Sequence, residues 1–197
     1  RRARPGAVCQ MTVSDLLAGV ELAAPLSPEL ASEVVSGLDY DSRRLCKGWV
    51  FFAFPGSRTD GRQFAADALA RGAVAVVSES EAPAALAPRW IRVGHGRRAL
   101  ALAARNFYHR PDERIQLTGI TGTNGKTTTG FLVDSVLRAA GKTTALVGTI
   151  EYHLAGRVLP AVNTTPESLD LMRLFTELEQ AGGSHATMEV SSHALAL

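Results

Sequence analysis

Short apolar runs alternate with helix-like segments along the first half of the chain. The apolar runs are rich in β-branched and aromatic residues, which is typical of buried strands. The predicted strands are 49–54, 73–77 and 89–93, and the predicted helices are 61–72 and 96–111. Gly72 and Pro111 end these two helices, because glycine favours a helix C-terminus and proline cannot continue one. The pattern predicts a small α/β domain over residues 11–110.

A second series of the same kind begins at residue 111. Its predicted strands are 114–121, 143–150 and 185–190, and its predicted helices are 125–140 and 165–183. Strands that alternate with helices of this length predict a parallel sheet, and we place a second domain at 111–197. About three strands are fewer than the ~4–6 of a usual sheet. We therefore expect the sequence to be the front part of a longer protein.

The composition narrows the class of protein. The 197 residues are 46% hydrophobic and 20% charged, as in globular proteins with a core, and the net charge of +2 gives little support to nucleic-acid binding. No apolar run approaches the ~20 residues of a membrane span. The two cysteines form neither a metal motif nor a disulfide framework. We expect a cytoplasmic protein without nucleic acid or membrane as partner, of unassigned oligomeric state, whose residues 1–10 are an unstructured leader.

The stretch "GITGTNGKTTTGF" (119–131) joins a predicted strand to a predicted helix. A helix N-terminus presents unpaired N–H groups and about half a positive charge, and Gly122 and Gly125 let the preceding loop curl around an anion. Lys126, one of only three lysines, adds a full charge, and the Thr127 hydroxyl is suited to bind Mg²⁺. The general phosphate-loop pattern requires glycine where Ile120 stands. An ordinary turn is the alternative interpretation.

Two polar stretches follow predicted strands of the first domain, "LDYDSRR" (38–44) and "FPGSRTDGRQF" (54–64). Ligands of α/β sheets bind at the carboxyl ends of strands, so both stretches are candidates for a binding site. The alternative is that the first is a capped turn and the second a bend.

Two further stretches belong to the second domain. The stretch "NTTPESLDL" (163–171) has two interpretations. Either its polar residues bind a ligand, or Thr165 is the N-cap of a helix with Pro166 in its first position. In "MEVSSHAL" (188–195), Glu189 ends an apolar strand, where burying an unpaired carboxylate is costly. A magnesium ligand beside the glycine-rich loop is the preferred interpretation, and a structural salt bridge is the alternative.

These five stretches, in this order, resemble the Mur ligase family, and within it the ligases that add the third amino acid to the cell-wall peptide. The resemblance implies ATP binding by Gly122, Thr123, Asn124, Gly125, Lys126, Thr127 and Thr128. It implies that Tyr40, Ser42, Ser57, Arg58 and Thr59 contact the uridine nucleotide, and that Asn163, Thr164, Thr165 and Ser191 contact the muramoyl-dipeptide. It further implies catalytic roles for Lys126, Thr127 and Glu189, with Thr127 and Glu189 holding Mg²⁺.

The resemblance also implies a reaction. An ATP- and Mg²⁺-dependent ligase would join meso-diaminopimelate or L-lysine to UDP-N-acetylmuramoyl-L-alanyl-D-glutamate through an acyl phosphate. The family's carbamylated lysine, its second metal and its domain that selects the amino acid lie beyond residue 197, so we expect these residues alone to be inactive. The alternatives are another Mur-superfamily ligase (the terminal dipeptide-adding enzyme or a folylpolyglutamate synthetase-like protein), a P-loop kinase, or a binding module.

Overall fold

The computed structural model describes residues 11–55, 60–161 and 163–192. The chain divides into two compact units between Phe107 and Tyr108, three residues before the predicted boundary. None of the helices in the described ranges combines the length and the apolar character that crossing a membrane requires.

The first unit contains a four-stranded parallel sheet in the order β3-β4-β5-β6. Its strands are β3 (Gly37–Asp39), β4 (Trp49–Phe52), β5 (Ala75–Ser78) and β6 (Trp90–Arg92). Its helices are α1 (Val13–Leu16), α2 (Pro28–Ser32), α3 (Ala65–Ala70) and α4 (Gly96–Phe107), with 3₁₀ turns η1 (Ser42–Arg44), η2 (Gly61–Phe64) and η3 (Ala84–Arg89). A separate two-stranded sheet pairs β1 (Met11–Thr12) with β2 (Val34–Val35).

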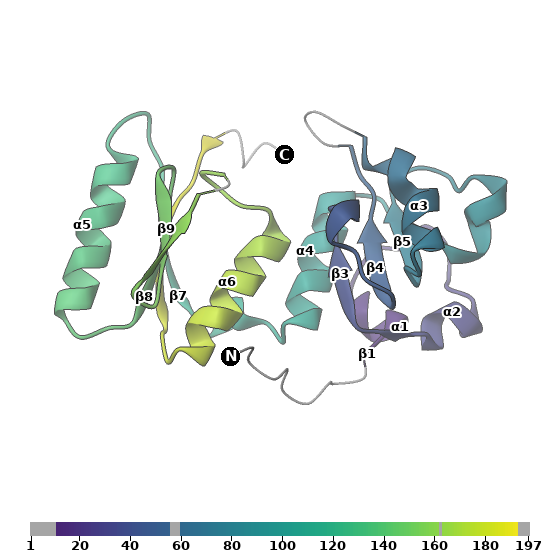
Figure 1. Cartoon of the computed structure of the whole chain (residues 1–197), viewed down its shortest axis with the longest axis horizontal. Coiled ribbons are helices and arrows are strands. Elements are labelled where there is room, and N and C mark those ends of the chain that lie inside the picture. The colour runs from purple at the N-terminus through teal and green to yellow at the C-terminus, as the bar shows by residue number, and fades with distance from the viewer. Residues whose placement is uncertain (1–10, 56–59, 162, 193–197) are drawn as a thin grey trace. The chain divides into compact units, whose positions relative to one another are not determined.

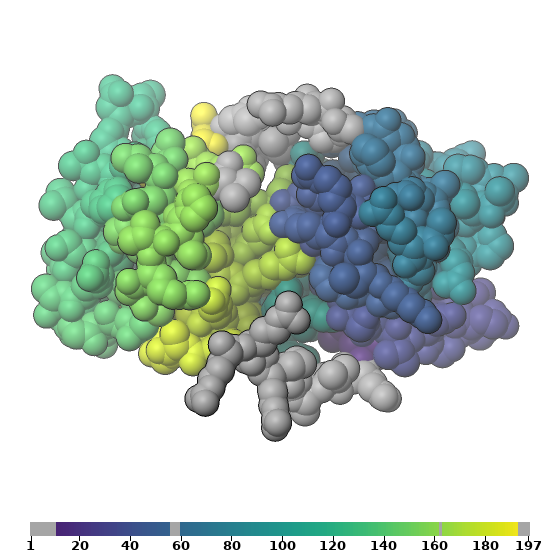
Figure 2. All heavy atoms as spheres, viewed as in Figure 1, coloured from purple at the N-terminus to yellow at the C-terminus, as the bar shows by residue number. Residues whose placement is uncertain are grey.

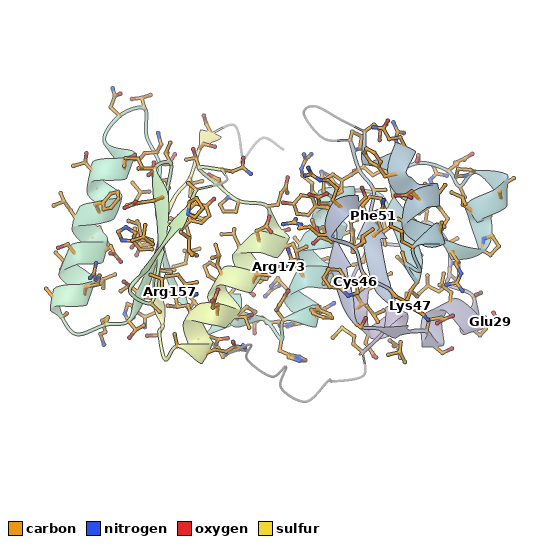
Figure 3. The ribbon with its side chains drawn as sticks, in the orientation of Figure 1. Glu29, Cys46, Lys47, Phe51, Arg157 and Arg173 are labelled. Atoms are coloured by element: carbon orange, nitrogen blue, oxygen red, sulfur yellow. The ribbon has the colours of Figure 1, made fainter. Side chains whose placement is uncertain are left out.

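The central strand β4 provides much of the core of this unit. Val50, Phe51 and Phe52 are each at most 1% exposed, and Phe51 packs with Val76 of β5 and Ala68 of α3 (Figure 3). Burial on both faces explains the unbroken apolar run in the sequence, because a parallel strand is covered on both sides.

The second unit contains a five-stranded sheet in the order β10-β9-β8-β11-β7. Its strands are β7 (Gln116–Ile120), β8 (Thr144–Val147), β9 (Glu151–Leu154), β10 (Arg157–Pro160) and β11 (His185–Glu189). After the 3₁₀ turn η4 (Pro111–Glu113), its helices are α5 (Lys126–Ala139) and α6 (Ser168–Gln180), which lie on opposite faces of the sheet (Figure 1). Parallel pairing of β7, β11 and β8 confirms the predicted α/β fold.

The hairpin of β9 and β10 was not predicted. It pairs antiparallel with β8 and extends the sheet beyond the three predicted strands. Arg157 of β10, labelled in Figure 3, forms an ion pair with Glu177 of α6 and so connects the hairpin to that helix. In the space-filling view, the light-green atoms of this region form part of the front surface of the second unit (Figure 2).

The position of β11 between β8 and β7 determines what gathers at one edge of the sheet. Glu189 is the register partner of Ile120 in β7, and Met188 is the partner of Val147 in β8. Glu189 is therefore level with the last residue of β7 and with the first residue after β8. The carboxyl ends of three parallel strands meet at this edge, where α/β folds bind ligands.

Candidate functional site

The loop 121–125 connects β7 to the N-terminus of α5. Gly122 has φ +143° and Gly125 has φ +80°. Residues with a Cβ rarely adopt such backbone conformations. All five loop residues are exposed, and Gly125 is the N-cap of α5, where no side chain bonds the first N–H groups. These groups are available to an anion, together with the positive end of the helix dipole.

Lys126 folds back over this loop. Its Nζ donates a 2.7 Å hydrogen bond to the carbonyl oxygen of Gly122. The ammonium group therefore lies beside the free N–H groups of the loop, and both favour negative charge at the same place.

Glu189 is the buried polar group of the site, with only 2% of its surface exposed. The hydroxyl of Thr127 donates to its Oε2 at 3.1 Å, and the hydroxyl of Thr149 donates to the same oxygen at 3.0 Å. The backbone N–H of Thr149 donates to Oε1 at 3.1 Å. None of the ion pairs among the described residues includes Glu189, so the predicted alternative of a structural salt bridge is not found there. A buried carboxylate held by neutral donors favours a cation beside it.

The donor set at this point fits Mg²⁺. Two oxygens at neighbouring positions around an octahedral ion, each ~2.1 Å from it, are about 3 Å apart, and Thr127 Oγ1 and Glu189 Oε2 are 3.1 Å apart. The described residues contain no group of three or more His, Cys, Asp or Glu side chains that could hold a metal by themselves. Magnesium would need phosphate and water oxygens as well, which is how it usually binds in nucleotide sites.

The polar turn 163–165 lies at the same edge of the sheet. Tyr152 of β9 anchors it, because the phenol donates to the carbonyl oxygen of Asn163 and accepts from its N–H. The hydroxyl oxygens of Thr164 and Thr149 are 3.2 Å apart. The turn is thereby connected to the hydroxyl that holds Glu189.

Thr165 does not cap α6, so the alternative interpretation of this turn is wrong. The helix begins at Ser168, and its N-cap is Glu167, whose backbone is extended. The Thr165 hydroxyl instead donates to the carbonyl oxygen of Glu189 at 3.0 Å and accepts from the N–H of Ser191 at 3.1 Å. Thr165 therefore joins the turn to the end of β11.

In the first unit, Asp39 lies at the carboxyl end of β3 and organises the turn that follows this strand. This carboxylate is fully buried and accepts from the N–H groups of Tyr40 and Asp41 at 2.8 and 2.9 Å. Arg44 forms an ion pair with it at 2.9 Å. The Tyr40 ring stacks on Phe54, which follows β4, with 6.1 Å between the ring centroids. The two predicted stretches of this unit therefore meet through these two rings.

Ser42 is the first residue of η1, which follows this turn. Asp41 caps η1 through the N–H of Arg43 and forms an ion pair with the Arg43 side chain at 2.7 Å. The hydrogen bond from the Arg43 guanidinium lowers the pKa of Asp41. The predicted residues Ser57, Arg58 and Thr59 lie outside the described residues. Pro55 and Asp60, at the two ends of that segment, form an isolated antiparallel bridge.

Comparison with known proteins gives the family. Residues 120–197 match the Mur ligase middle domain, and residues 34–108 match the Mur ligase family catalytic domain. The chain is 71% identical over 187 residues to the UDP-N-acetylmuramoyl-L-alanyl-D-glutamate--2,6-diaminopimelate ligase of Solibacter usitatus, a match that covers 95% of the chain. The chain belongs to the Mur ligase family. It spans 38% of the length of that relative.

Two solved structures support the fold of this Mur ligase chain. A UDP-N-acetylmuramoyl-L-alanyl-D-glutamate--2,6-diaminopimelate ligase superposes with a TM-score of 0.78 and 26% identity, covering 95% of our chain and 37% of the other. A MurF ligase from Thermotoga maritima, in complex with ADP, has a TM-score of 0.52 and 22% identity, covering 79% of our chain and 32% of the other. The second shows the fold alone.

The sequence interpretation missed two residues of this Mur ligase site, Gly148 and Thr149. Both follow β8, and the sequence assigned them to a strand that was predicted to run to residue 150. A Gly-Thr pair directly after a buried strand was the available signal, because it places a small residue and a hydroxyl at the ligand-binding edge.

Proposed function

We propose that this chain is the N-terminal part of an ATP-dependent ligase that joins meso-diaminopimelate to UDP-N-acetylmuramoyl-L-alanyl-D-glutamate. The observation that carries the proposal is the contact of Thr127 with Glu189 beside the glycine-rich loop. The turn with Thr164 and Thr165 lies at the same edge, so a nucleotide and an acceptor carboxylate could meet there.

The reaction needs activation because a carboxylate does not react with an amine at neutral pH. Transfer of the γ-phosphoryl group of ATP to the carboxylate gives an acyl phosphate, and the amine then displaces phosphate. For such a reaction, positioning and charge neutralisation supply most of the catalysis. The site offers groups for both tasks.

In this proposal the loop 122–125 surrounds the phosphates with backbone N–H groups. Lys126 leaves the Gly122 carbonyl oxygen and binds the β- and γ-phosphate oxygens, and Thr128 binds a further phosphate oxygen. Thr127 and Glu189 would hold Mg²⁺, which would neutralise charge on the phosphates.

We assign the two parts of the muramoyl substrate, its dipeptide and its uridine nucleotide, to different residues of the chain. Asn163, Thr164, Thr165 and Ser191 would orient the muramoyl-dipeptide, because they form the turn and strand end next to Glu189. The domain 11–110 would bind the uridine nucleotide through Tyr40, Ser42 and the segment with Ser57, Arg58 and Thr59, and the domain 111–197 would bind ATP. The 71% identical relative is a 2,6-diaminopimelate ligase, which favours diaminopimelate over L-lysine as the added amino acid. We place the enzyme in the cytoplasm with these substrates.

The proposal is tested with the full-length protein. We expect ADP, phosphate and a tripeptide nucleotide of the corresponding mass from ATP, Mg²⁺, the muramoyl-dipeptide nucleotide and meso-diaminopimelate, with far less product from L-lysine. Product from D-alanyl-D-alanine and a muramoyl-tripeptide, with none from the dipeptide, would assign the terminal step of the family and contradict the proposal.

A further inference from the structure

We infer that Thr149 is the positioning residue of this site: it holds the Glu189 carboxylate in its metal-binding orientation and connects it to the substrate turn. The inference rests on the proposed function and adds to it a residue that the family resemblance did not include. Thr149 is exposed two residues after the end of β8, whereas Glu189 is buried.

Two of the three hydrogen bonds that described residues give to the Glu189 side chain come from Thr149. The backbone N–H bonds Oε1 at 3.1 Å, and the hydroxyl bonds Oε2 at 3.0 Å. One residue thus contacts both oxygens, which fixes the plane of the carboxylate as well as its position. Contacts of this kind orient metal ligands in proteins.

The third bond comes from Thr127, which we also assign to the magnesium ion. As a magnesium ligand, Thr127 would give an oxygen lone pair to the ion, so its position would depend on the ion as well as on Glu189. Among the described donors to this carboxylate, Thr149 alone has no assigned role as a metal ligand. The orientation of Glu189 in the working enzyme therefore depends on Thr149.

The hydroxyl of Thr149 also extends the chain of contacts to the substrate turn. A hydroxyl has one proton and two lone pairs, and an ionised carboxylate only accepts. The Thr149 hydroxyl is within donating distance of two acceptors, Oε2 of Glu189 at 3.0 Å and the Thr164 hydroxyl oxygen at 3.2 Å, and its one proton serves one of them at a time. This hydroxyl therefore contacts both the metal ligand and the substrate turn and places them relative to each other.

The test compares three variants of the full-length protein. Thr149→Val removes the hydroxyl but keeps the backbone N–H and the side-chain shape, and Thr149→Ser keeps the hydroxyl. Thr176→Val is the matched control, because its hydroxyl donates to the Met172 carbonyl oxygen within α6, apart from the site residues. Binding of Mn²⁺ in the presence of a non-hydrolysable ATP analogue is measured by electron paramagnetic resonance, and the KM for the muramoyl-dipeptide nucleotide is measured at saturating Mg²⁺.

We expect Thr149→Val to weaken Mn²⁺ binding about tenfold or more and to raise the KM for the muramoyl substrate, because outer contacts of metal ligands contribute ~10–100-fold. Thr149→Ser should stay within about threefold of wild type in both measurements, and Thr176→Val should equal wild type. Unchanged Mn²⁺ binding in Thr149→Val would overturn the inference, as would equal losses in the Val and Ser variants, which would mean a packing role. If wild type binds Mn²⁺–nucleotide but ligates no muramoyl dipeptide, the proposed function fails, while a loss of Mn²⁺ binding in Thr149→Val still supports the positioning of Glu189.

Discussion

Gly148 leaves the space that the Glu189 carboxylate occupies. A Cβ at position 148 would lie 2.5 Å from Oε1 of Glu189, closer than real Cβ atoms approach other atoms. The position is buried directly after β8, next to the carboxylate whose Oε2 we assign to magnesium. The glycine is therefore needed for the close approach of the carboxylate.

Gly148→Ala is expected to displace Glu189 and to weaken Mg²⁺ binding by the full-length protein about tenfold or more. Overpacking should also lower the free energy of unfolding by about 1–3 kcal/mol. Metal titration of the nucleotide complex and urea denaturation measure the two effects. Gly94→Ala is the control, because a Cβ at Gly94 meets nothing within 4 Å. Wild-type metal affinity in Gly148→Ala would show that the carboxylate is not confined there.

Lys126→Ala should abolish ligation while leaving the affinity for the uridine nucleotide nearly unchanged. The ammonium group lies over the glycine-rich loop, 2.7 Å from the Gly122 carbonyl oxygen, and the second unit holds no residue that we assign to uridine. Turnover of the full-length variant and calorimetric titration with UDP-N-acetylmuramoyl-dipeptide are the two measurements. Lys142→Ala, outside the loop, is the control, and retained turnover in Lys126→Ala would refute the role of this lysine.

Ser42→Ala should raise the KM for the muramoyl nucleotide and leave the KM for ATP as it is. Ser42 begins η1 directly after the Tyr40 turn, where we place the uridine contacts. Steady-state kinetics with each substrate varied in turn separate the two constants. Ser32→Ala, which loses only a hydrogen bond to the Glu29 carbonyl oxygen, is the matched control. Equal losses for both substrates would contradict our division of the site between the two domains.

Asp39→Ala should lower the free energy of unfolding by about 1–3 kcal/mol, because it removes the acceptor of two backbone N–H groups and of Arg44. Asp39→Asn keeps an acceptor oxygen and should cost less. Asp67 provides the control, because its side chain is about half exposed and forms a surface ion pair with Arg71. Asp67→Ala should change the free energy of unfolding by no more than about 0.5 kcal/mol. Urea denaturation of the full-length variants is the measurement, and equal effects at both positions would rule out the organising role of Asp39.

The main elements could be predicted because their apolar residues are continuous or helically spaced. The segment 125–140 was predicted as a helix and α5 runs from Lys126 to Ala139, while β11 follows the predicted strand 185–190 to within one residue. The hairpin of β9 and β10 was missed because its turn is Ala155-Gly156, both with positive φ, rather than the Asn-Gly or Asp-Gly pair that marks such turns.

The sequence predicted candidate residues for the site, but it could not predict how they contact one another. Thr127 and Glu189 are 62 residues apart, and their contact depends on the insertion of β11 between two earlier strands. The same insertion makes Thr149 a partner of Glu189, whereas the local pattern only showed a threonine after an apolar run. The N-cap interpretation of Thr165 relied on the preference of threonine for helix N-caps. In the structure, the Thr165 hydroxyl instead forms long-range hydrogen bonds with the backbone of Glu189 and Ser191.

The strand order also has a consequence for biosynthesis. β7 and β8 each pair with β11 and not with one another, although β11 is made last of the three. On the ribosome, the glycine-rich loop and α5 emerge well before the strand that separates β7 from β8 and carries Glu189. A nascent chain stalled before residue 185 would thus present the glycine-rich loop with neither a central strand to join its sheet nor the acidic group beside it.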